Sequence, residues 1–394
     1  MTDVAERLDE LRQRGLYRRL RLIEGPQGPS VTLDGRPVLL LCSNNYLGLA
    51  DRAEVREAAA GAALRWGAGA GASRLISGNM EPHRELERRL AAFKGYEASL
   101  LFGSGYLANT GVIAALAGRG EVVFSDELNH ASIVDGCRLS RAETFVYRHG
   151  DVEHLAWGLR QAGERAALIV TDGVFSMDGD VAPLPELLEL ARRHGARLMV
   201  DEAHATGAVG PGGRGSVSAA GLNGEVDLVV GTLGKALGSY GAYACAGAET
   251  IELLVNTARP FIFSTAPPPA AAGGALAALS ILEAEPELVE RLQANAATLR
   301  AALGDEGLGV GASATQVVPV EVGAAETTME LCERALRRGV FAQGIRPPTV
   351  PEGSSRLRFT AMATHRPEEL IGAAREVGAA ARELGLVASE PLAA

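Results

Sequence analysis

Short apolar runs alternate with amphipathic runs between about residues 45 and 265. The apolar runs are rich in Val, Ile, Leu and Phe, and polar or glycine residues end each of them, which is typical of buried strands. The intervening runs have helical periodicity, as in Tyr106–Ala117 and Pro185–His194. This alternation predicts an α/β chain with a mainly parallel sheet and helices on both faces. The five predicted strands are Ser99–Phe102, Val122–Phe124, Ala167–Thr171, Leu198–Val200 and Leu228–Val230.

The two ends of the chain have a different pattern. An amphipathic helix is predicted over Thr2–Gly15, and a hairpin with an Asp34-Gly35 turn follows a linker rich in glycine and proline. From about residue 285, helical runs alternate with strand-like runs at Gln316–Val322 and Leu357–Thr360. The sequence therefore predicts three parts: an N-terminal helix and strand segment over 1–45, a large α/β domain over 46–284, and a smaller α+β domain over 285–394.

Composition and charge narrow the class of protein. Hydrophobic residues make up 47% and charged residues 22%, as in a soluble globular chain, and the net charge of −10 disfavours nucleic acid and anionic membranes as partners. The apolar stretch Ala266–Leu282 contains three prolines and is short for a membrane span, so a buried helix is expected. The N-terminus has no apolar signal core, so we expect a cytoplasmic protein. Four cysteines without a CxxC pair or a metal-ligand spacing predict reduced thiols and no metal site: Cys42, Cys137, Cys245 and Cys332.

Polar residues follow four of the predicted strands. Ligands of open α/β sheets bind outside the carboxyl ends of the strands, so these four places are candidates for one site. A glycine turn leads into a helix at Gly103–Tyr106, where free N–H groups can bind an anion. The other three are the loop Gly173–Asp180, Asp201 with His204, and Thr232–Lys235. Each of them alone is as readily an ordinary turn, cap or ion pair.

The side chains of Asp201 and Lys235 suggest the kind of molecule that binds here. An acid at the end of a buried strand, such as Asp201, is costly unless it is paired, and a pyridinium nitrogen is one fitting partner. Lys235 follows a buried strand in a glycine-lined turn, and desolvation of a lysine amine favours Schiff-base chemistry. The segment is not a Walker A loop, because Val229 and Ala236 replace the glycine and the Ser/Thr of that motif.

Taken together, these motifs resemble those of the α-oxoamine synthases, a family of fold type I pyridoxal-phosphate enzymes, from about Leu11 to about Leu386. The resemblance implies a large domain with a mainly parallel seven-stranded sheet flanked by helices, plus a smaller α+β C-terminal domain. It also implies pyridoxal 5′-phosphate as cofactor and a homodimer with the active site at the subunit interface. The motifs that carry it are Ser43–Gly48, Gly71–Leu75, Asn129–Ser132, the Ser176 loop, Asp201–His204 and Thr232–Lys235.

The resemblance assigns roles around the cofactor. Lys235 would carry the cofactor and then act as base on the amino acid, and Asp201 would keep the pyridine nitrogen protonated. His204 and Ser176 would contact the region of the ring oxygen, and His130 would stack on the ring and steer the acyl carbonyl. Gly105 and Tyr106 would offer backbone N–H groups to the cofactor, and Thr232 would offer its hydroxyl to the phosphate. Thr265 would approach the phosphate from the second subunit.

It also assigns the substrates. Arg358 and Asn44 would bind the carboxylate of the amino acid, beside His130, because a guanidinium binds a carboxylate through two parallel hydrogen bonds. Thr349 and Arg18 would contact the acyl substrate, although Arg19 and Arg21 lie beside Arg18. The loop Ala236–Tyr243 departs from the family pattern in its bulky Tyr240.

Within the family, Ile345–Pro351 most resembles the members that condense L-alanine with a pimeloyl thioester of CoA or acyl carrier protein, with loss of CO₂. Their product is 8-amino-7-oxononanoate, an intermediate of biotin biosynthesis. The alternatives are a family member that joins glycine to acetyl-CoA (2-amino-3-ketobutyrate CoA ligase), an aminotransferase, and a non-catalytic binding protein with this fold. The intact set of Lys235, Asp201 and His204 argues against the last.

Overall fold

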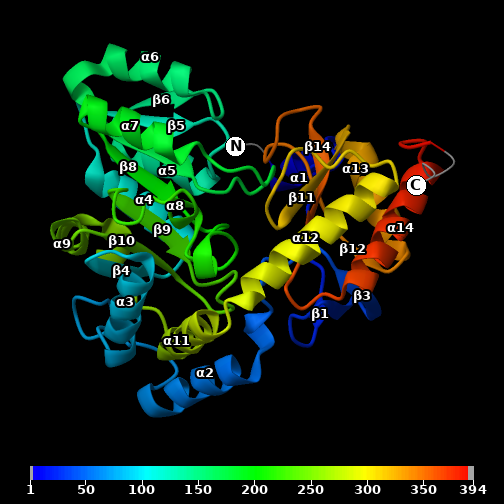
Figure 1. The fold of residues 1–394 in the computed structure, drawn as a ribbon, viewed down its shortest axis with the longest axis horizontal. Helices are drawn as coiled ribbons and strands as arrows, with labels where there is room; N and C mark the ends of the chain where they lie inside the picture. The colour runs from blue at the N-terminus through cyan, green and yellow to red at the C-terminus, as the bar shows by residue number, and fades with distance from the viewer. Residues whose placement is uncertain (1–2, 389–394) are drawn as a thin grey trace. The chain divides into compact units, whose positions relative to one another are not determined.

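The computed structural model describes residues 3–388 (Figure 1), and these form two compact units. The larger unit comprises Leu49–Ser176 and Asp180–Val289, and the smaller unit comprises the other described residues, including Met177–Gly179. The described part of the segment predicted over 1–45 shares a unit with the C-terminal part, because its strand β3 (Arg36–Leu40) pairs in parallel with β12 (Val340–Phe341). The strands of this segment contribute buried side chains to the smaller unit, namely Val31, Leu33, Val38 and Leu40.

The larger unit contains a seven-stranded sheet in the order β4-β10-β9-β8-β7-β5-β6. Strand β10 is antiparallel to both of its neighbours, and the other pairs are parallel. The α/β class, the parallel sheet and the five predicted strands are confirmed, whereas β6 and β10 were not predicted. Strand β6 lies at the edge of the sheet with mostly exposed side chains, and β10 is rich in alanine. The strands are β4 Ala98–Phe102, β5 Val122–Asp126, β6 Glu143–Tyr147, β7 Ala166–Asp172, β8 Arg197–Asp201, β9 Leu228–Thr232 and β10 Ala242–Ala246.

Helices on both sides of this sheet are set by local signals. Ser104 caps α4 through a hydrogen bond from the Leu107 N–H, and Gly195 ends α7 with a positive φ of 66°. The helices are α2 Ala53–Trp66, α3 Glu81–Lys94, α4 Gly105–Leu116, α5 Ala131–Ser140, α6 Val152–Ala162, α7 Leu184–His194, α8 Ser216–Ala219, α9 Ala248–Thr257, α10 Arg259–Ile262 and α11 Pro269–Ala284. Three short 3₁₀ helices are η1 Leu49–Asp51, η2 Gly163–Arg165 and η3 Pro211–Gly213.

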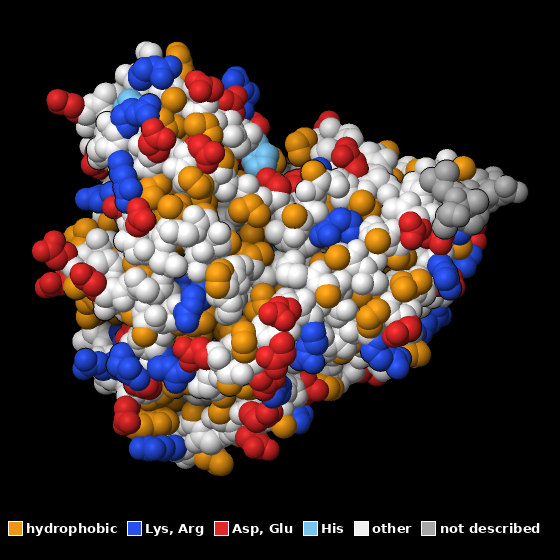
Figure 2. Space-filling model, viewed as in Figure 1, with side chains coloured by type: hydrophobic (Ala, Val, Ile, Leu, Met, Phe, Trp, Pro, Cys, Tyr) orange, Lys and Arg blue, Asp and Glu red, His pale blue; other side chains and the backbone are white. Residues whose placement is uncertain are grey.

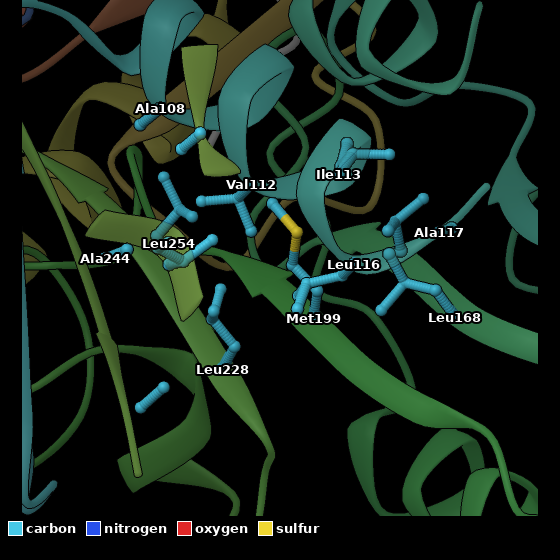
Figure 3. Packing of buried hydrophobic residues seen from close by; sticks show 14 of the residues in the cluster. Ala108, Val112, Ile113, Leu116, Ala117, Leu168, Met199, Leu228, Ala244 and Leu254 are labelled. Atoms are coloured by element: carbon cyan, nitrogen blue, oxygen red, sulfur yellow. The ribbon is translucent and has the colours of Figure 1, made fainter. Parts of the chain in front are cut away.

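The core of the larger unit packs α4 against the middle of the sheet. Figure 3 shows Val112 and Leu116 of α4 facing Met199 of β8 and Leu228 of β9. All four side chains are buried, and burial of a side chain of this size contributes about 1.5–3 kcal/mol. This packing fixes the N-terminus of α4 relative to the carboxyl ends of β8 and β9, where the predicted site residues lie.

Among the described residues, the smaller unit has two small sheets, three helices of its own and most of a fourth. Strands β1 (Ile23–Glu24), β2 (Ser30–Leu33), β3 and β12 form one sheet, and the hairpin predicted around Asp34-Gly35 is confirmed. The other sheet has the order β11-β14-β13. Its strands are β11 Val317–Gly323, β13 Gln343–Ile345 and β14 Ser355–Thr360. The helices of the unit are α1 Val4–Gln13, α13 Ala325–Arg337 and α14 Pro367–Glu383. Helix α12, Glu287–Asp305, begins in the larger unit and continues into the smaller one.

The charged side chains on the surface and the cysteines are as the composition predicts. Acidic and basic side chains are interspersed on the face that Figure 2 shows. All four cysteines are free, and three of them are buried. Within residues 3–388, no helix has the length and apolar character that crossing a membrane requires.

Candidate active site

The carboxylate of Asp201 at the end of β8 is buried, with 4% of its surface exposed. Its Oδ1 accepts a hydrogen bond from the Ala203 N–H at 2.8 Å, and its Oδ2 accepts one from Asn109 Nδ2 at 2.6 Å. Both of these donors are neutral, and the described residues provide no ion-pair partner for Asp201. A buried carboxylate needs a positive partner. The protonated ring nitrogen of pyridoxal 5′-phosphate has the charge and the N–H donor that fit this position.

Lys235 lies in the turn between β9 and β10, and its Nζ is 2.8 Å from Nε2 of the buried His204. The turn requires glycine at position 238, where φ is +58° and a Cβ would lie 2.4 Å from the Ala50 nitrogen. The neighbouring imidazole and the partial burial of Lys235 keep its amine out of bulk water. The turn thus holds a primary amine next to a group that can exchange a proton with it.

The chain contains only two lysines, Lys94 and Lys235. Lys94 is 4% exposed and is bound to Glu202, to the Arg214 carbonyl oxygen and, at 3.4 Å, to Thr206 Oγ1. An amine that is held in this way cannot leave its carboxylate to attack an aldehyde. Lys235 is therefore the lysine that can carry the cofactor.

His130 follows β5 and caps the N-terminus of α5. Its backbone N–H donates to Asp172 Oδ2 at 2.8 Å, and its Nδ1 is 2.7 Å from Ser132 Oγ. His130 is exposed, but the protein around it lowers its pKa by desolvation; the charge of Asp201 opposes this shift and the charge of Lys235 adds to it. An open face and a neutral ring suit stacking on an aromatic cofactor.

Asp172 lies beside Asp201, because their Cα atoms are partners in the β7–β8 ladder. Burial raises the pKa of Asp172 well above its usual range, and the charge of Asp201 raises it further. Asp172 thus holds the backbone of His130 at a position next to Asp201.

The start of α4 presents the backbone N–H groups of Gly105 and Tyr106, which have no partner within an α-helix. Thr232 Oγ1 donates to the Gly241 carbonyl at 3.1 Å and accepts from the Gly234 N–H at 3.2 Å. A helix N-terminus and a threonine hydroxyl suit a phosphate. The Tyr106 ring is 46% exposed and its hydroxyl donates to Asp135, a bond that raises the Tyr106 pKa.

Two further residues are predicted to bind the cofactor, Ser176 and Thr265. Ser176 is half-buried in the loop after β7, and Thr265 is exposed and forms an isolated antiparallel bridge with Ser73. Sequence reasoning missed the role of Asn109, Ser132 and Asp172. Asn109 is a polar residue inside the apolar stretch of α4, which was a detectable signal.

The residues that are predicted to bind the carboxylate of the amino acid, Arg358 and Asn44, lie in the smaller unit. Arg358 of β14 is 6% exposed, and its guanidinium donates to Asn44 Oδ1 at 3.3–3.4 Å and to the Tyr46 hydroxyl at 3.4 Å. These contacts are long and the acceptors are neutral. A substrate carboxylate would be a stronger acceptor for the same guanidinium.

Arg18 and Thr349 line a cavity of the smaller unit with a volume of about 990 Å³. Arg19, Arg21 and the 8% exposed Arg346 line it as well. Arg21 is bound to Glu333, whereas burial and the nearby charge of Arg18 lower the pKa of Arg346. Excess positive charge makes this cavity suited to an anion.

Residues 36–377 match the model of the family described as aminotransferase class I and II. The chain belongs to this family. It is 53% identical over 390 residues to the 8-amino-7-oxononanoate synthase of Citrifermentans bemidjiense, covering 98% of this chain and 100% of the relative. It is 54% identical over 388 residues to the enzyme of the same name from Geobacter sulfurreducens, covering 98% and 99%.

The chain is also similar in structure to enzymes that have been solved. A serine palmitoyltransferase of S. paucimobilis, solved with a PLP–myriocin adduct, has a TM-score of 0.92 and 33% identity, with 98% of each chain covered. An 8-amino-7-oxononanoate synthase of Francisella tularensis has a TM-score of 0.77 and 25% identity, covering 88% of this chain and 99% of that one. The predicted fold type, cofactor and enzyme class are confirmed by these matches, and the predicted reaction is the one that the relatives' name describes.

Proposed function

We propose that the protein condenses L-alanine with a pimeloyl thioester of CoA or acyl carrier protein, releases CO₂ and forms 8-amino-7-oxononanoate for biotin biosynthesis. The observation that carries the proposal is the placement of Lys235 next to His204, in a unit whose buried Asp201 lacks a cation. The names of relatives that are more than 50% identical support the choice of substrates.

Pyridoxal 5′-phosphate, when bound, supplies an electron sink for the carbanion of the amino acid. Asp201 would hold the proton on the ring nitrogen, because its buried carboxylate is stabilised by a positive partner. Lys235 would hold the cofactor and then take the α-proton of the amino acid, and His204 would keep the amine oriented. Ser176 would contact the ring oxygen, and Gly105, Tyr106 and Thr232 would bind the phosphate.

Arg358 and Asn44 would bind the carboxylate of alanine until CO₂ is lost, and His130 would act on the acyl carbonyl. Arg18 and Thr349 would contact the acyl chain in the cavity of the smaller unit, whose positive charge suits the free carboxylate of a pimeloyl group better than an acetyl group. A homodimer, in which Thr265 of each subunit serves the other, completes the proposal. Free thiols support a cytoplasmic location.

An assay of released thiol and CO₂ tests the proposal. Purified enzyme with bound cofactor would be given L-alanine, glycine or L-serine together with pimeloyl, acetyl or palmitoyl thioesters. We expect equal amounts of thiol and CO₂ with L-alanine and the pimeloyl thioester, and much lower values for the other pairs. A preference for glycine with acetyl-CoA would favour the alternative reaction, and amino-group transfer without thiol release would favour an aminotransferase.

An Arg358→Lys variant separates binding of the amino acid from the chemistry. Lysine keeps the charge but loses the two parallel donors, so we expect the KM for L-alanine to rise about tenfold or more, while the KM for the thioester stays within about twofold. An Arg356→Lys variant is the matched control, because Arg356 is two positions away on β14 and forms an ion pair with Asp178 instead. An equal effect of both variants would contradict the role of Arg358.

A further inference from the structure

A chain of hydrogen bonds links Asp201 to His130 through two residues to which the proposed function gives no role, Asn109 and Ser132. Asn109 Nδ2 donates to Asp201 Oδ2 at 2.6 Å and to Ser132 Oγ at 2.9 Å, and Ser132 Oγ lies 2.7 Å from His130 Nδ1. Asn109 and Ser132 are each 1% exposed. Bulk water therefore does not compete for these bonds.

Chemistry fixes the direction of each bond. A carboxylate only accepts hydrogen bonds, so Asn109 must turn its NH₂ group, not its oxygen, toward Asp201. Its Oδ1 is buried and has no partner among the described residues, which indicates that the carboxylate imposes this orientation. The same NH₂ group then donates its second proton to Ser132 Oγ. The hydroxyl proton of Ser132 is left for His130 Nδ1.

A second bond reaches the same ring nitrogen. The backbone N–H of Ser132 lies 3.2 Å from His130 Nδ1, and a backbone N–H can only donate. A ring nitrogen that accepts from a hydroxyl and from an amide must carry a lone pair. The proton of the neutral imidazole is then on Nε2.

We propose that Asn109 and Ser132 are positioning residues that fix His130 as a neutral imidazole with its proton on Nε2. The use of this proton rests on the proposed function. His130 would present an N–H donor to the acyl carbonyl oxygen, and it would not offer a second base beside Lys235. The charged and titratable groups that face His130 are Asp201 on β8, Asp172 on β7 and Lys235 after β9.

The tautomer can be measured in the cofactor-free protein by ¹H–¹⁵N correlation spectra with ¹⁵N-histidine labelling. The chain has seven histidines, so His130→Gln assigns the signal by its disappearance. We expect proton-bound Nε2 and bare Nδ1 in the wild type. Ser132→Ala removes the hydroxyl donor to the neutral form, so the His130 pKa should rise by about one pH unit, the size of one neutral hydrogen bond. Asn109→Leu should raise it by a smaller amount.

Two variants serve as matched controls. Ser132→Thr keeps the hydroxyl and should restore the wild-type pKa and tautomer. Ser140→Ala removes another buried hydroxyl of α5, one that donates to the Cys137 carbonyl at 2.6 Å, and should leave the His130 signals unchanged. In the holoenzyme, the acid limb of the kcat profile should move up with the His130 pKa in Ser132→Ala and in neither control.

A proton on Nδ1 in the wild type would overturn the proposal, and so would a Ser132→Ala variant that shifts His130 no more than Ser140→Ala does. The spectra need neither substrate nor cofactor. A failure of the condensation assay with the Nε2 tautomer present would therefore refute the proposed reaction and leave the positioning role supported.

Discussion

The two lysines of the chain lie close to the end of the same strand, β8, and have opposite environments. Asp201, the last residue of β8, is bound by Asn109, whereas the next residue, Glu202, binds Lys94. Lys94 is bound to a fully buried carboxylate. Lys235 is half-buried beside a histidine. Lys94 is therefore held in a buried ion pair, whereas Lys235 keeps its amine next to a weak base, which is the environment that the proposed function requires.

The largest expected effect follows the loss of the reactive amine. Lys235→Ala should lower kcat by at least about 10³-fold, because the base and the covalent attachment of the cofactor are both removed. Its unfolding free energy without cofactor should stay within about 1 kcal/mol of the wild type, because a half-buried side chain is truncated. Kinetics of thiol release and urea unfolding of the cofactor-free protein measure the two quantities. Activity within tenfold of the wild type would contradict a role of the Lys235 amine in the reaction.

Lys94→Met should lower the stability of the protein and leave the cofactor site intact. It leaves the Glu202 carboxylate buried without its cation, and loss of one partner of a buried ion pair costs about 3–5 kcal/mol. Urea unfolding should show this loss, while the protein that remains folded should still bind the cofactor at Lys235.

A double variant distinguishes charge from packing at the same position. Lys94→Met with Glu202→Gln removes the unpaired charge but keeps an oxygen to accept from the Val217 N–H. It should recover at least half of the lost stability. A double variant as unstable as the single one would show that the methylene packing of Lys94, not its charge, stabilises the fold.

A smaller, pH-dependent effect is expected at His149, which bridges Asp126 at 2.9 Å and Asp180 at 2.8 Å. Hydrogen bonds to these carboxylates raise the His149 pKa to about 10, above its unfolded value of about 6.5. The stabilisation is therefore complete below pH 6.5 and is lost as pH rises toward 10. We expect the difference in unfolding free energy between the wild type and His149→Gln to shrink by at least about 2 kcal/mol from pH 6 to pH 9.5, because each unit of pKa shift corresponds to about 1.4 kcal/mol. A difference that stays constant with pH would contradict this assignment.

The smallest effect is expected for an exposed ion pair. Arg193 and Glu189 are one helical turn apart on α7, with 61% and 68% of their side chains exposed. Arg193→Ala should change the unfolding free energy by about 0.5 kcal/mol or less, because water screens the pair. Thermal melts at low and high salt would check this; a loss as large as that of Lys94→Met would mean that burial is not what separates the two ion pairs.

The sequence predicted the central strands of the larger unit and the residues that end them, because buried apolar runs and glycine turns are local signals. It predicted Lys235 as the lysine that carries the cofactor, but it could not predict the ion pair of Lys94, since its partner Glu202 lies 108 positions away in the sequence. Strand β10 escaped prediction because Ala242–Ala246 has no β-branched residue. The hydrogen bonds from Asn109 escaped because its partners lie 23 and 92 positions away in the sequence.

Reduction of the holoenzyme with borohydride, followed by peptide mapping, tests the central claim most directly. The reduced cofactor should be found on the peptide that contains Lys235, and none should be found on Lys94, the other lysine of the chain. A label on Lys94, or on neither lysine, would contradict the account.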